Sequence, residues 1–86
     1  MPGYHLREIK RGVFGEVSKI TEEYEEFLES LEQKNPVMAL VELSDLIGAI
    51  EGYALRHHKI SLDDLLALKD ATKRAFESGH RTAKRY

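Results

Sequence analysis

The chain has 86 residues, no cysteine and a formal net charge of −2. This length suits one domain with a modest core. The lack of cysteine excludes a disulfide framework and a thiolate metal site, and the near-neutral charge argues against a dedicated nucleic-acid-binding protein.

The composition predicts a folded helical protein. The chain is 42% hydrophobic and 33% charged with only 2 prolines, which is typical of a globular chain and unlike a disordered one. No run approaches the ~18 apolar residues of a membrane span, and the first residues lack a signal-peptide core. We therefore expect a single domain over residues 1–86, cytoplasmic and without a membrane partner.

Residues 1–12 alternate weakly between apolar and polar side chains, which predicts an extended arm. Helical spacing then favours a first helix over residues 13–33 with one apolar stripe facing the core. Glu23 and Glu26 border this stripe. The stripe consists of Val13, Val17, Ile20, Tyr24, Phe27 and Leu31, and the side chains expected to point toward water are Glu22, Glu25, Glu29 and Glu32.

Two further helices follow. Asn35 before Pro36 is a typical helix start and predicts a helix over residues 36–55 after a turn at Lys34-Asn35. Its small residues Gly48 and Gly52 predict close packing. Ser61 with Asp64 resembles a capping box and opens a third helix over residues 61–78, and residues 80–86 form a basic tail.

The second helix is apolar on nearly all sides, and such a helix is usually buried. A hairpin and one more helix leave part of it uncovered. We therefore expect an all-α fold in which a three-helix protomer completes a four-helix-type bundle by forming a homo-oligomer, a dimer or tetramer.

Glu42 and Asp45 are the charged residues of this apolar helix between Val37 and Ile50. They lie three apart on one face, where burial of like charges requires protonation, basic partners or a metal ion. Counting from the turn, Glu26 is level with Glu42, and Glu23 is level with Asp45. At 1.5 Å per residue, both pairs lie roughly 12–17 Å from the turn, which favours one shared metal site.

The two acidic pairs carry a resemblance. Residues 19–27 followed by Glu42-Leu43-Ser44-Asp45 resemble the ExxE…ExxD signature of the all-α nucleoside triphosphate pyrophosphohydrolases, which include MazG-like proteins, dimeric dUTPases and phosphoribosyl-ATP pyrophosphohydrolase. Gly12-Val13-Phe14-Gly15-Glu16 is most similar to the short, phage-type MazG-like proteins. The resemblance covers residues 12–54 and weakens onward to Arg81.

The resemblance implies a catalytic and metal-binding set formed by Glu23, Glu26, Glu42 and Asp45. These residues would bind Mg²⁺, with Mn²⁺ as a substitute, since hard oxygen ligands suit both ions. Water would attack the α-phosphorus of a nucleoside triphosphate and yield a nucleoside monophosphate and pyrophosphate. A triphosphate also needs basic partners, for which the candidates are Lys19, Lys69, Lys73, Arg74 and Arg81.

A second interpretation stays open. The acidic pairs could serve in salt bridges of a non-catalytic helical interaction module, since a solvated acidic face is common on helices. Dependence on Mg²⁺ separates the two hypotheses.

Overall fold

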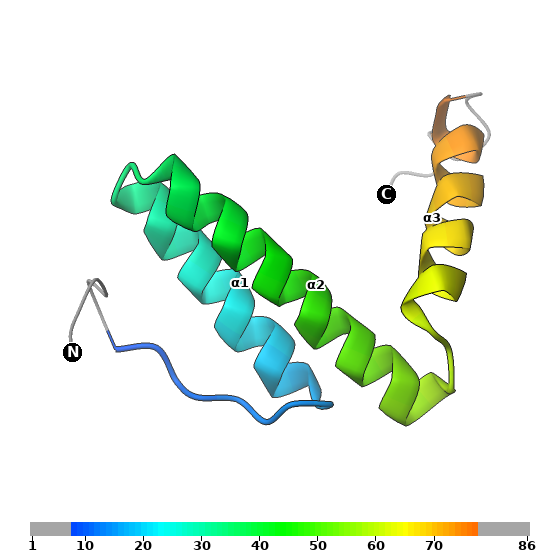
Figure 1. Ribbon diagram of the computed structural model, residues 1–86, viewed down its shortest axis with the longest axis horizontal. Coiled ribbons are helices and arrows are strands. Elements are labelled where there is room, and N and C mark those ends of the chain that lie inside the picture. The colour runs from blue at the N-terminus through cyan, green and yellow to red at the C-terminus, as the bar shows by residue number, and fades with distance from the viewer. Residues whose placement is uncertain (1–7, 78–86) are drawn as a thin grey trace.

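The computed structural model describes the backbone of residues 8–77 and the side chains of residues 8–73 (Figure 1). Its helices are α1 (Val17–Glu32), α2 (Pro36–His58) and α3 (Leu62–Glu77), and the described residues contain no strand. α1 and α2 lie side by side as an antiparallel hairpin, while α3 extends from the far end of α2, apart from α1 (Figure 1). This confirms the predicted all-α hairpin with a third helix.

Local signals fix the ends of the helices. The side chain of Asn35 accepts a hydrogen bond from Met38 N–H at 3.1 Å, and Pro36 occupies the first turn of α2. Lys34 takes a left-handed conformation with φ 56°, which reverses the chain between α1 and α2. Ser61 Oγ accepts the Asp64 N–H at 3.1 Å, as its capping role predicts.

Two predicted boundaries are wrong. The first helix begins at Val17 instead of residue 13, because Gly15 has φ 91° and cannot belong to a helix. The second helix continues beyond residue 55 to His58, and the left-handed residue that ends it is Lys59, with φ 57°. The third helix, Leu62–Glu77, differs from the expected range by one residue at each end.

The apolar core of the single chain is thin. Among the described residues, the buried apolar side chains are Ala39, Ala49 and Ala54. The stripe predicted to face the core is largely exposed, as Val17 at 58% and Leu31 at 51% show. Small residues let the helices approach closely, and the large apolar side chains are left on the outside of the hairpin.

The two glycines of α2 differ in their surroundings. A Cβ on Gly52 would lie 2.5 Å from the ring of Phe14. This glycine therefore makes room for the segment before α1, residues 8–16, which we call the arm, and not for another helix. A Cβ on Gly48 would meet no atom of the described residues within 4 Å. Within the described chain, no helix is both long enough and apolar enough to cross a membrane.

Candidate metal centre

The hairpin brings carboxylates of α1 and α2 together at one height. Glu23, Glu42 and Asp45 each offer an oxygen within 4.8 Å of the other two. Glu23 also belongs to a second group of the same kind with Glu22 and Glu26. The four acidic residues singled out in the sequence therefore gather around Glu23, and we call these residues together with Glu22 the acidic cluster.

The cluster is partly buried. Glu42 is 2% exposed and Glu23 is 6% exposed, whereas Asp45 is exposed and does not share the burial expected for it. Glu23 Oε1 is fully buried and accepts no hydrogen bond from the described residues. A buried carboxylate oxygen without a donor is costly, so a proton or a cation at this atom would stabilise the fold.

A proton compensates part of the charge. Burial, followed by the charges of Glu23 and Glu42, raises the pKa of Glu26 to about 8. The Glu26 carboxyl is also hydrogen-bonded to Glu42. Near neutral pH the protonated form of Glu26 is therefore favoured, and this carboxyl shares its hydrogen bond with Glu42.

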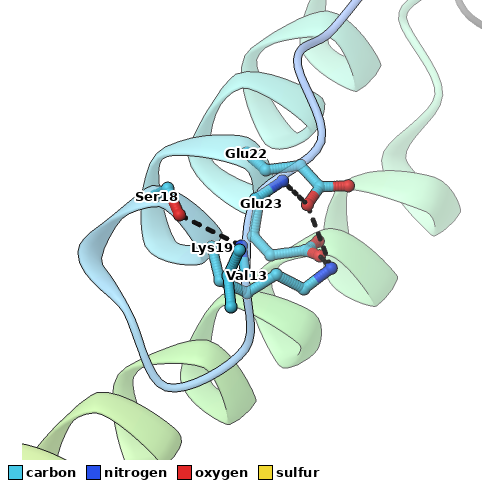
Figure 2. A network of polar contacts seen from close by, with 6 residues as sticks. Val13, Ser18, Lys19, Glu22 and Glu23 are labelled. Atoms are coloured by element: carbon cyan, nitrogen blue, oxygen red, sulfur yellow. Dashed lines mark hydrogen bonds and ion pairs between the residues drawn. The ribbon is translucent and has the colours of Figure 1, made fainter.

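Lys19 neutralises another part of the negative charge of the acidic cluster. Its Nζ atom lies 3.0 Å from Glu22 Oε1 and 3.0 Å from Glu23 Oε2 (Figure 2). Hydrogen bonds to Glu23 and then Glu22 raise the pKa of Lys19 above its usual value. The cluster thus combines two of the compensations expected for buried carboxylates, a proton and a basic partner.

The arm before α1 is attached to the same cluster. Gly12 N–H donates to Glu22 Oε1 at 2.9 Å, and Val13 N–H donates to Ser18 Oγ at 3.0 Å (Figure 2). Burial favours a higher pKa for Glu22, but the Gly12 N–H, Lys19 and the charge of Arg11 hold that pKa below its usual value. Glu22 is therefore ionised and structurally engaged, not directed toward water as its position in the sequence suggested.

The other predicted basic residues do not reach this cluster in the described chain. Lys69 and Lys73 lie on α3, which stands apart from α1 (Figure 1). With Leu65 and Leu68 they line an open, mainly apolar surface pocket of about 520 Å³. Lys69 pairs with Asp70 at 2.8 Å. Arg74 belongs to α3, with a side chain beyond those described, and Arg81 lies outside the described residues.

Sequence reasoning missed the roles of Gly12, Glu22 and Arg11. The one available signal was the basic pair Lys10-Arg11, which directly precedes the acidic helix. The types of the residues do not predict that a backbone N–H donates to a side chain ten positions later. Glu29 was also expected to face water, but it is 1% exposed and shares a face of α1 with Glu22, seven residues earlier.

No family model, curated protein or solved structure was found to match this chain. The donor set itself fits a hard divalent cation. Its carboxylate oxygens form two groups of three, each within 4.8 Å, and Glu23 belongs to both groups. Mg²⁺ and Mn²⁺ prefer such ligands, and a charge of +2 would stabilise an oxygen that lacks a donor.

Proposed function

We propose that this protein is a Mg²⁺-dependent nucleoside triphosphate pyrophosphohydrolase. The observation that carries the proposal is the buried Glu23 carboxylate, whose Oε1 accepts no hydrogen bond from the described residues inside a group of converging acidic side chains. The resemblance to the ExxE…ExxD signature supports the reaction class. The reaction would cleave an NTP or dNTP into a nucleoside monophosphate and pyrophosphate.

In this proposal Glu23, Glu26, Glu42 and Asp45 hold the metal ion. Mg²⁺, when bound, neutralises phosphate charge and activates a water molecule. In the metal-free chain the pKa of Glu26 is about 8, so binding of the metal ion would release the proton of this carboxyl. Lys19 supplies positive charge beside the site, where the phosphates of the substrate would lie.

The test is pyrophosphate release from a panel of NTPs and dNTPs, with Mg²⁺ and with EDTA. We expect release that depends on Mg²⁺, and we expect Mg²⁺ with the preferred nucleotide to raise the melting temperature. Release from no nucleotide by a folded sample would overturn the proposal.

Substitutions test the assignment of the site. Glu23→Gln and Glu42→Gln keep the side-chain shape but remove a negative metal ligand, so we expect turnover to fall by at least about a hundredfold, within the range ascribed to such groups. Glu25→Gln is the matched control, because Glu25 lies on the same helix and is exposed. Normal turnover by Glu42→Gln would show that the site is assigned wrongly.

The proposal includes assembly of the chain with copies of itself. Large apolar side chains account for much of the outer surface of α2. They are Val37, Leu40, Val41, Leu43, Ile47, Ile50 and Leu55.

A second copy is the partner that every solution of this protein contains, and it offers the same apolar face. Pairing these faces would bury α2 and complete a four-helix-type bundle as a dimer or tetramer. The same exposed face also favours the second candidate function, a non-catalytic interaction module. That function would remain if the oligomer formed but hydrolysed no nucleotide.

A further inference from the structure

Lys19 places an ammonium group inside the acidic cluster. Its Nζ atom lies 3.0 Å from both Glu22 Oε1 and Glu23 Oε2 (Figure 2). The side chain of Lys19 is 27% exposed, and those of Glu22 and Glu23 are 12% and 8% exposed. These ion pairs are therefore shielded from water more than ordinary surface pairs, and their charges interact more strongly.

The arm holds this ammonium group in place. Glu22 Oε1, the oxygen that contacts Lys19, also accepts the Gly12 N–H at 2.9 Å. Gly12 can approach so closely because it lacks a side chain, since a Cβ there would lie 2.6 Å from Lys19 N and would overlap Ser18 O. The backbone of the arm therefore fixes Glu22, and Glu22 fixes Lys19.

Glu23 connects this network to the proposed metal ligands. Its Oε2 binds Lys19, while its carboxylate also belongs to the group formed with Glu42 and Asp45. A divalent ion on Glu23 would lie within a few ångströms of the Lys19 ammonium, and two like charges at that distance repel strongly at low dielectric. Glu23 cannot serve both cations at full strength.

We propose that Lys19 is a resident counter-ion of the acidic cluster and that a divalent metal ion displaces it from Glu23. This inference rests on the metal site of the proposed function. Without metal, Lys19 neutralises Glu23 and keeps the hairpin folded. With metal, the ammonium leaves Glu23 and is free to contact an anionic group on the bound nucleotide.

The experiment measures binding of Mn²⁺ alone, without nucleotide, to the wild type and four variants by electron paramagnetic resonance and calorimetry. Lys19→Met should bind Mn²⁺ about tenfold more tightly than the wild type, a difference of about 1.4 kcal/mol, because it removes the competing charge. Lys19→Arg keeps that charge and should stay within about threefold of the wild type. Lys34→Met is the matched control, since Lys34 is exposed at the α1–α2 turn.

A stability measurement separates this role from simple packing. Without metal, Lys19→Met should melt at a lower temperature than the wild type, because Glu23 loses its ion pair. Saturating Mn²⁺ should remove that deficit. A side chain that only packs would lower the melting temperature without tightening Mn²⁺ binding.

The outcomes distinguish the two proposals. If the wild type binds Mn²⁺, Glu23→Gln abolishes binding, and Lys19→Met binds no more tightly than the wild type, then the counter-ion role is wrong and the metal site stands. If neither the wild type nor Lys19→Met binds Mn²⁺, the metal site and the counter-ion role both fail. Binding by Lys19→Met alone would support the displacement directly.

A measurement on the unaltered chain covers the case in which Lys19→Met fails to fold. The ¹⁵Nζ signal of Lys19 should show slow proton exchange without metal, and titration with Mg²⁺ should shift that signal and speed the exchange. A signal that stays unchanged while Mg²⁺ saturates the carboxylates would overturn the proposal.

Discussion

At the scale of single residues, two different groups neutralise the negative charge of the acidic cluster. Glu23 is ion-paired to Lys19, while Glu26 shares a proton with Glu42. Each compensation is reversible, because an ammonium can move away and a proton can leave. A purely structural salt bridge does not need counter-charges that can be replaced, so this arrangement favours a site that exchanges cations.

The pH dependence of stability follows from Glu26. Its pKa of about 8 in the folded chain lies above the ordinary value of 4.5, so folding favours the protonated form. This contribution to stability is complete below about pH 4.5 and is lost as the pH rises through 8. We expect the melting temperature of metal-free protein to fall between pH 5 and pH 9.

The variant Glu26→Gln mimics the protonated carboxyl and should flatten this pH profile, most clearly above pH 8. Mg²⁺ should reverse the trend, because the metal ion binds the ionised form and its affinity should rise with pH. Thermal melts across this range in EDTA and in Mg²⁺ measure both effects. A Glu26→Gln profile that runs parallel to the wild type would show that another group is responsible.

At the scale of elements, sequence patterns predicted the helices and an extended arm, but not the contacts that the arm makes. Asn35 and Ser61 marked the starts of α2 and α3 correctly, because a cap is a local hydrogen bond. The pairing of Glu26 with Glu42, and of Glu23 with Asp45, followed from counting residues, because helix rise is constant. The contacts of Gly12 with Glu22 and of Phe14 with Gly52 are long-range, and no local pattern encodes them.

The arm offers a paired test at two glycines. Gly12→Ala places a methyl group against the backbone of Ser18 and Lys19, which cannot move cheaply, so we expect a loss of about 1–3 kcal/mol in the free energy of unfolding. Gly52→Ala meets only the end of the Phe14 ring, and its gain in helix propensity is about 1 kcal/mol, so we expect a change within about 1 kcal/mol. Denaturant unfolding measures both.

Amide hydrogen exchange shows which part of the chain the Gly12→Ala substitution destabilises. Gly12→Ala should speed exchange at the arm amides that donate to Glu22 and Ser18, and it should leave the middle of α2 protected. Equal losses of stability in Gly12→Ala and Gly52→Ala would contradict the close backbone approach at Gly12.

At the scale of the whole molecule, the described part of the chain buries a few polar side chains and leaves many large apolar ones exposed. Glu23, Glu42 and the alanines lie inside, while Leu40 and Ile47 are 69% and 50% exposed. The sequence predicted that the stripe of α1 faces the core, but Val17 and Leu31 are 58% and 51% exposed in the single chain. For α2 it predicted cover by partner chains. The spacing of apolar residues predicts that one face of a helix is buried, but it does not predict whether the helix that covers this face belongs to the same chain.

Assembly is tested by charging the outer face of α2. Ile47→Glu should shift the protein from oligomer to monomer in light scattering coupled to gel filtration, because a carboxylate resists burial between two apolar faces. Lys34→Glu is the control, since Lys34 is exposed at the turn, and it should leave the mass unchanged. A monomeric wild type at micromolar concentration would contradict self-assembly.

The short connection between α1 and α2 also has an evolutionary consequence. Exposed loops usually accept insertions, and the connection from Gln33 to Asn35 lies at the end of the hairpin. A residue added to this loop can be absorbed by it, whereas one added within α2 before Glu42 would turn Glu42 by about 100° and shift it by about 1.5 Å relative to α1. Both helices would survive, but Glu42 would no longer meet Glu23. We therefore expect active relatives to vary in the residues and length of this loop and to keep the spacing from the start of α2 to Glu42.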